Sequence, residues 1–126
     1  MIEVKDLKKS FDEVEVLKGI STTFETGKVN LIIGQSGSGK TVFLKSLLNV
    51  YQPTSGGILF DGRDINKMSR DEKQLLRAEI GTVFQGSALF DSMTVEENIT
   101  FPLDMFTNLT FREKKRRAFE VIGRVH

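Results

Sequence analysis

Hydrophobic and polar residues alternate along the first part of the chain. In "IEVKDLKKSF" (2–11), Ile2, Val4 and Leu7 are separated by polar side chains, which predicts a strand with one buried face. The stretch 14–24 has a similar pattern and predicts one or two further strands separated by polar turns. Its apolar positions are Val14, Val16, Ile20 and Phe24. The chain is therefore expected to begin with half-buried strands.

A different pattern follows in "KVNLIIG" (28–34), where apolar residues run almost without interruption. Such a run is typical of a strand that is buried on both faces, and Gly34 ends it. Beyond Lys40, apolar residues recur at helical spacing as far as Val50. They are Val42, Phe43, Leu44, Leu47 and Leu48. The glycine-rich stretch in between is therefore predicted to join a buried strand to an amphipathic helix.

Three later helices are predicted from their first residues. Each begins with a hydroxyl side chain followed three residues later by a carboxylate, which is the capping-box pattern. The pairs are Ser69 with Glu72, Thr94 with Glu97, and Thr110 with Glu113. Before them, the turn cluster "QPTSGG" (52–57) leads to a short predicted strand (58–60) and a turn at Asp61-Gly62. Elements of both kinds therefore alternate, as in an α/β protein.

Two more segments are predicted to be buried. "IGTVFQ" (80–85) has the composition of a buried strand, with Ile80, Val83 and Phe84 as its apolar residues. The last helix is expected to bury Ala118, Val121, Ile122 and Val125. No repeat, low-complexity stretch or linker composition divides the chain, so a single domain is expected.

Composition and charge exclude several classes of protein. The formal net charge of +1 gives no general attraction to nucleic acid, and the basic run 114–117 is expected to be a solvated helix face. Without cysteine there is no disulfide and no thiolate metal site. No apolar run approaches the roughly 20 residues that span a bilayer. The charged start is not a signal peptide, so a cytoplasmic protein is expected.

The stretch "GQSGSGKT" (34–41) fits the phosphate-loop pattern G-x-x-x-x-G-K-[ST], and its predicted strand–loop–helix context supports that interpretation. Backbone N–H groups from about Gly37 to Thr41 are expected to surround a β-phosphate, backed by the positive end of the helix. Lys40 is expected to reach the β- and γ-phosphates, and the Thr41 hydroxyl to bind Mg²⁺. The loop therefore predicts a nucleoside triphosphate as ligand.

Nearly the whole chain resembles the ATP-binding subunits of ABC transporters. "SFDEVEVLKGIS" (10–21) resembles the segment before the phosphate loop of that family, with Phe11 at the position of the aromatic residue that stacks on adenine. "YQPTSGGILFDGRDI" (51–65) resembles its antiparallel stretch. "VFQGSALFDSMTVEENI" (83–99) resembles its glutamine loop, in which Gln85 would contact Mg²⁺ and the attacking water.

The resemblance implies the fold of an ABC-type P-loop NTPase, with ATP and Mg²⁺ as ligands. It implies cofactor-binding roles for Phe11, Gly34, Ser36, Gly37, Ser38, Gly39, Lys40, Thr41 and Val42, catalytic roles for Lys40 and Gln85, and metal-binding roles for Thr41 and Gln85. It also implies two partners, a second ATP-binding subunit and a membrane-embedded permease that meets the segment after Gln85. The protein would then lie on the cytoplasmic face of the inner membrane, without nucleic-acid partners.

Two features resemble one branch of the family, the Mla-type phospholipid transporters that work with MCE-domain proteins. Val42 stands where most of these subunits carry a second hydroxyl residue, so one side-chain contact to the α-phosphate is lost while the backbone N–H remains. The other feature is "GSALFDSMTV" (86–95). A lipid is therefore the expected cargo, and another import or export system is the alternative.

Parts that hydrolysis requires are not visible in the sequence. The family uses an acidic strand, an "LSGGQ"-like signature and a switch histidine. Asp61 fits a strand–turn junction better than an acidic strand end, and His126 is expected to be solvated. The resemblance implies that residues 1–126 are the N-terminal part of the domain, truncated before the signature and the acidic (Walker B) strand. We therefore expect no ATPase activity from this chain alone, and poor stability or self-association through an unpaired sheet edge.

Two other classes of protein are alternatives to this interpretation. A small phosphate-loop kinase or GTPase complete at this length would need its own acidic strand or an Asn-Lys-x-Asp motif, and neither is present. A non-catalytic module that binds ATP without splitting it stays open at the level of sequence.

Overall fold

The computed structural model describes residues 1–86 and 88–125 and contains two compact units, Met1–Ile80 and Gly81–His126. No linker composition separates the two units, so the sequence pattern did not predict the division. It follows from the contacts that each unit makes within itself.

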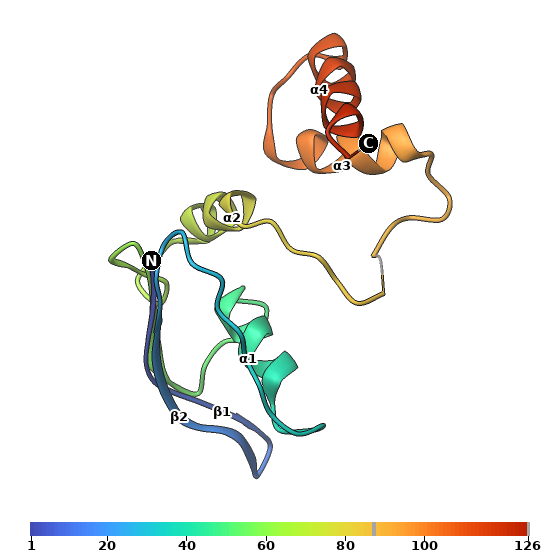
Figure 1. Ribbon diagram of the computed structural model, residues 1–126. Helices are drawn as coiled ribbons and strands as arrows, with labels where there is room; N and C mark the ends of the chain where they lie inside the picture. Colours follow the sequence, from blue (N-terminus) through green and yellow to red (C-terminus); the bar gives the residue numbers. More distant parts are fainter. Residues whose placement is uncertain (87, 126) are drawn as a thin grey trace. The chain divides into compact units, whose positions relative to one another are not determined.

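The first unit is an antiparallel sheet with two helices (Figure 1). Its strands are β1 (Ile2–Phe11), β2 (Val14–Phe24), β3 (Ser55–Phe60) and β4 (Arg63–Asp64), in the order β2-β1-β3-β4. Its helices are α1 (Lys40–Leu47) and α2 (Arg70–Glu79). The predicted strands in 2–11, 14–24 and 58–60 are thus confirmed, and 14–24 is one continuous strand.

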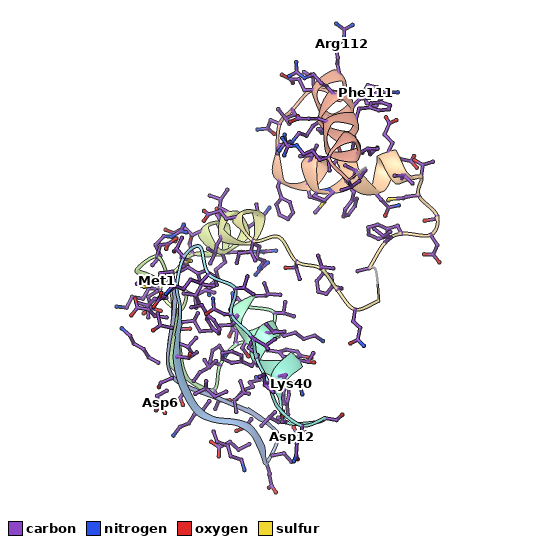
Figure 2. The ribbon with its side chains drawn as sticks, viewed as in Figure 1. Met1, Asp6, Asp12, Lys40, Phe111 and Arg112 are labelled. Atoms are coloured by element: carbon purple, nitrogen blue, oxygen red, sulfur yellow. The ribbon has the colours of Figure 1, made fainter. Side chains whose placement is uncertain are left out.

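A bulge in β1 explains the uneven spacing of its apolar residues. Val4 and Leu7 are both buried although they are three positions apart, whereas a regular strand would turn them to opposite faces. Asp6, between them, has a positive φ of 43°, and the strand register shifts on both sides of it. The extra residue returns Leu7 to the core face. Asp6 lies on β1 in Figure 2, and its N–H donates to Ser21 Oγ at 2.9 Å.

The core of this unit lies between the sheet and its helices. Its buried residues are Val4, Leu7, Leu17, Phe43, Leu47, Ile58, Phe60, Ile65 and Leu76. Phe24 of β2 and Phe43 of α1 are 6.2 Å apart between ring centroids. The buried face of α1 therefore packs against the sheet, and this contact positions the loop that precedes the helix.

The predicted turn at Asp61-Gly62 is confirmed. Both residues have positive φ angles, 46° and 77°, as a two-residue hairpin turn of type I′ requires. Next to the turn, Arg63 donates two hydrogen bonds to the Glu79 carboxylate, at 3.2 and 2.7 Å, and so connects β4 to α2. Asp61 is thus a turn residue, as the Asp-Gly signal indicated.

Two predicted buried strands, 28–34 and 80–85, are not strands in the described part of the chain. Val29, Leu31 and Ile33 are 100%, 80% and 84% exposed, and Val83 is fully exposed as well. A strand that is buried on both faces needs hydrogen-bonded neighbours and covering layers. No described strand pairs with either segment, so apolar composition alone did not produce burial.

The second unit contains α3 (Val95–Phe106) and α4 (Phe111–Gly123), which pack against each other. The Lys114 ammonium contacts the Asp104 carboxylate at 2.7 Å across the pair. Ala118 is buried and Val121 and Ile122 are half-buried as expected, but Val125 lies beyond the helix end and is 77% exposed. His126, predicted to be solvated, and Ser87 within "GSALFDSMTV" lie outside the described residues. None of the described helices has the length and apolar character needed to cross a membrane.

Candidate functional site

The glycine-rich loop 34–41 ends directly in α1, as the motif predicts. Gly37 and Gly39 have φ angles of +78° and +91°, a region that side chains disfavour. Gly39 is the N-cap of α1, so no side chain caps the first turn, which also carries no acidic residue. The helix therefore begins with backbone N–H groups and a positive dipole end that an anion can meet.

Two of the loop's glycines lie close to neighbouring side chains. A Cβ on Gly34 would lie 2.6 Å from Ser38 Oγ. A Cβ on Gly39 would lie 3.1 Å from Val16 Cγ1 and 3.3 Å from Leu17 Cδ2. The start of α1 therefore rests directly on β2, which fixes the loop against the sheet.

Lys40 is held at the mouth of the loop. Its Nζ donates to the carbonyl oxygens of Gly34 at 2.7 Å and Gln35 at 2.6 Å. The Ser38 N–H donates to the same Gln35 carbonyl at 3.2 Å. Figure 2 shows Lys40 at the start of α1, and the two carbonyls that its ammonium contacts belong to the loop that leads into this helix.

The remaining loop residues divide into exposed and packed positions. Ser36 and Thr41 are exposed, so their hydroxyls are accessible to a ligand. Val42 is half-buried and packs against the core cluster. This packing gives the apolar side chain at position 42 a structural role, while its backbone belongs to the first turn of α1.

Two of the hollows beside the loop have Val16 of β2 in their lining. One, of about 350 Å³, is lined by Val16, Ser36, Gly37, Gly39, Lys40, Thr41 and Val42. The other, of about 470 Å³, is lined by Val14, Glu15, Val16, Leu17, Lys18, Ile20, Gly37 and Ser38. Because both share Val16 and Gly37, they form a path from the phosphate loop to Val14.

Phe11 lies at the far end of this path. It is the last residue of β1 and pairs across the sheet with Val14. Its side chain is 39% exposed, so it is not a core phenylalanine. Its ring meets Tyr51 edge-on, with centroids 5.2 Å apart. The structure therefore places an accessible aromatic ring beside the hollow that leads to the loop.

Gln85 belongs to the second unit and is exposed at a turn with Gly86. Its role toward metal and water stays a prediction.

The described residues contain no group of three or more His, Cys, Asp or Glu side chains that could hold a metal ion. Mg²⁺ at phosphate sites usually takes only one or two protein ligands, because phosphate oxygens and water complete its shell. A single hydroxyl such as that of Thr41 fits this kind of site.

The sequence pattern gives no functional signal for two residues, Val16 and Tyr51. It predicts Val16 only as an apolar strand position, yet Val16 lines both hollows and lies next to the loop at Gly39. It predicts Tyr51 only as part of a stretch before the turn cluster, yet Tyr51 contacts Phe11. Nothing in the local pattern distinguishes them, because both roles arise from contacts across the fold.

Residues 17–126 match the family of sequences described as "ABC transporter". "Probable ribonucleotide transport ATP-binding protein mkl" of Mycobacterium leprae is 43% identical over 102 residues, which cover 81% of this chain and 29% of that protein. "Methionine import ATP-binding protein MetN 1" of Rhodococcus jostii is 38% identical over 129 residues, which cover 99% of this chain and 38% of that protein. The chain thus spans about a third of the length of these relatives.

Solved structures are similar over most of the chain. The dimeric bacterial ABC transporter cassette MJ0796 has a TM-score of 0.84 and 30% identity, covering 95% of this chain and 55% of the other. The same cassette has also been solved in a post-hydrolysis state with ADP and Pi. CbiO1 from Clostridium perfringens, part of the complex cbiONQ, has a TM-score of 0.80 and 31% identity, covering 98% of this chain and 49% of the other.

Proposed function

This chain belongs to the ABC transporter family and has the fold of its ATP-binding cassette, and we propose that it binds ATP with Mg²⁺ on the loop 34–41. One observation carries the proposal. The Lys40 ammonium, held by the Gly34 and Gln35 carbonyls, lies beside the N-terminus of α1, which has no side-chain cap. A cation next to open N–H donors suits a polyphosphate.

The proposed orientation follows the path along β2. The phosphates lie on the backbone of Gly34 and of residues 36–42, with Lys40 at the β- and γ-phosphates and Thr41 at Mg²⁺. The sugar lies along Val16, and the base stacks on the exposed ring of Phe11. When bound, Mg²⁺ would neutralise charge that develops on the phosphates.

Hydrolysis is proposed for the complete protein, with Gln85 orienting the attacking water and contacting Mg²⁺. This chain spans only about a third of the relatives that it matches. Asp61 is in a turn, and the only described strand that ends in an acidic residue is β4, whose Asp64 lies at the edge of the sheet opposite β2. The 126-residue chain alone is therefore expected to bind ATP without releasing phosphate.

The proposal is tested by titrating ATP and GTP with Mg²⁺ into the chain in a calorimeter. Lys40→Ala is expected to weaken ATP binding by about 10- to 150-fold, because it removes a charged hydrogen-bond donor from the phosphates. Lys67→Ala is the matched control, since it removes an ammonium that is 84% exposed in the same unit. Equal affinity of the Lys40→Ala variant and the unaltered chain, or no binding by the unaltered chain, would overturn the proposal.

For the whole protein we propose a transport motor with two partners. A second copy of the complete cassette would close each ATP site, and a permease would contact the segment after Gln85. The complex would lie on the cytoplasmic face of the membrane. The relatives support a transporter in general terms, because CbiO1 is part of the complex cbiONQ and MJ0796 is a dimer.

The proposed cargo is a phospholipid or another lipid, on the basis of Val42 and the segment 86–95. The names of the two curated relatives refer to ribonucleotide transport and methionine import, so ribonucleotides and methionine are the competing cargoes. ATP hydrolysis by the complete transporter in proteoliposomes is expected to rise with the phospholipid supplied and not with methionine or ribonucleotides. Stimulation by either soluble compound alone would overturn the lipid proposal.

A further inference from the structure

Four side chains form a cluster at the base end of the proposed ATP site. Phe11 and Tyr51 meet at an interplanar angle of 81°, with ring centroids 5.2 Å apart. The Lys9 ammonium lies 4.9 Å from the Phe11 centroid, and the Lys45 ammonium lies 5.3 Å from the Tyr51 centroid. Edge-to-face aromatic pairs and cation–aromatic contacts both have preferred geometries. The cluster therefore restricts the plane of the Phe11 ring.

Tyr51 is itself held by the end of α1. The N–H groups of Val50 and Tyr51 both donate to the Lys45 carbonyl, at 2.8 and 3.2 Å. Tyr51 is half-buried, whereas Phe11 is at the exposed end of a hairpin strand. The Tyr51 ring is thus the better anchored of the two, and it supports the more exposed Phe11 ring. Because α1 begins at the phosphate loop, one helix carries both the loop and the support for the Phe11 ring.

We propose that Tyr51 is a positioning residue for the nucleotide base, acting through Phe11; this inference rests on the proposed ATP site. An exposed phenylalanine at the end of a strand loses rotational freedom when a base stacks on it, and this loss weakens binding. In this structure the ring is already oriented by Tyr51 and remains 39% exposed for a ligand. Tyr51 therefore raises nucleotide affinity without touching the nucleotide.

This role predicts which ligands bind more weakly when Tyr51 is lost. Stacking uses the π-face that every base has, whereas the phosphates are held by the loop. Loss of Tyr51 should therefore weaken binding of ATP and GTP alike. It should leave the affinity for inorganic tripolyphosphate with Mg²⁺ unchanged, because that ligand has no base.

The affinity test compares Tyr51→Leu with Tyr51→Phe in the full 126-residue chain. Tyr51→Leu is expected to weaken ATP binding by about three- to tenfold, while Tyr51→Phe, which keeps the ring, retains the affinity. Phe11→Leu should lose at least as much, and adding Tyr51→Leu to it should cause little further loss. Phe119→Leu is the matched control, because Phe119 is also exposed and also has a lysine ammonium, that of Lys115, 5.9 Å from its ring centroid.

A spectroscopic readout is available because Tyr51 is the only tyrosine in the chain and there is no tryptophan. Excitation of tyrosine therefore reports on this ring alone. ATP is expected to change the Tyr51 emission after correction for nucleotide absorbance, and tripolyphosphate is not. In Phe11→Leu the change should disappear, since the ring that transmits it is gone.

Two outcomes would overturn the inference. One is unchanged ATP affinity in Tyr51→Leu. The other is an equal loss of affinity for ATP and tripolyphosphate, which would show that Tyr51 acts through α1 and the loop. A failure of the proposed ATP site gives a different result. In that case the Lys40→Ala variant keeps full affinity for both ATP and tripolyphosphate, which overturns the proposed function and not the role of Tyr51. A chain that binds neither ligand overturns both.

Discussion

At the scale of single residues, two glycines lie against the β1 bulge. Gly56 of β3 has a φ of +85°, and a Cβ built on it would lie 2.2 Å from the Asp6 carbonyl oxygen. Gly19 of β2 faces the same residue from the other side, where a Cβ would lie 2.7 Å from Asp6 Oδ1. The strands on either side of β1 therefore each carry a glycine at this point, and the two glycines leave room for the bulge that places Leu7 in the core.

Replacing Gly56 tests this arrangement, with Gly62 as the matched position. Both have a positive φ, but a Cβ on Gly62 meets nothing within 4 Å. Gly62→Ala is expected to cost about 1–3 kcal/mol of unfolding free energy, from dihedral strain alone. Gly56→Ala should cost clearly more, because backbone atoms of the bulge must move. Urea unfolding of both variants measures the difference, and equal losses would contradict this account of the bulge.

At the scale of elements, α2, α3 and α4 begin in the same way. In each helix the N3 carboxylate accepts a hydrogen bond from the N-cap backbone N–H, and the N-cap hydroxyl accepts one from the N3 N–H. The carboxylates are those of Glu72, Glu97 and Glu113. The pKa of each is lowered because the N-cap residue hydrogen-bonds to its charged form. All three capping boxes were predicted from the sequence, and the structure confirms them.

These capping boxes predict how the helices respond to acid. A carboxylate whose pKa is lowered by folding stabilises the fold above its ordinary value of 4.5, and this stabilisation is lost as the pH falls toward the lowered pKa. The helical signal in far-ultraviolet circular dichroism is therefore expected to decline below about pH 4.5.

A triple variant, Glu72→Gln, Glu97→Gln and Glu113→Gln, isolates this contribution. Glutamine still accepts the N-cap hydrogen bond but does not titrate, so the acid loss of helical signal should be smaller than in the unaltered chain. The Arg63–Glu79 pair is unchanged in the variant and retains its own acid response, because the pKa of Glu79 is lowered by its hydrogen bond to Arg63. Identical titration curves for the two chains would refute the assignment.

At the scale of the whole molecule, the segment 28–34 exposes apolar side chains that its sequence pattern predicts to be buried. Ile32 packs against the core, whereas Val29, Leu31 and Ile33 are exposed. An extended apolar segment with unpaired backbone groups is a site where another chain can add a strand. We therefore expect the 126-residue chain to self-associate through this segment.

Val29→Lys tests the prediction, because a charge on an edge opposes strand addition. Val29 is fully exposed, so the change does not disturb a packed core. The variant is expected to sediment as a smaller species than the unaltered chain in analytical ultracentrifugation. Leu75→Lys on α2 is the control, since it removes an exposed apolar side chain without altering an edge. A monomeric unaltered chain with a sharp cooperative melt would contradict the prediction.

Features that depend on a few neighbouring residues were predictable. The phosphate loop, the Asp61-Gly62 turn and the three capping boxes each rest on contacts between residues at most six positions apart. The strands predicted at 28–34 and 80–85 failed for the opposite reason. Burial of a strand is decided by what lies beside it, and no described strand pairs with either segment.

The amino-acid sequence alone predicts the phosphate ligand proposed for this protein and the starts of its helices, because glycine dihedrals, caps and the lysine act locally. The three-dimensional fold is needed to show which other residues lie at the candidate site. Packing of α1 on β2 brings Val16 to Gly39, and the chain after α1 carries Tyr51 to Phe11. These contacts join residues far apart in sequence, and such proximity is produced by strand pairing and core packing rather than by any local pattern.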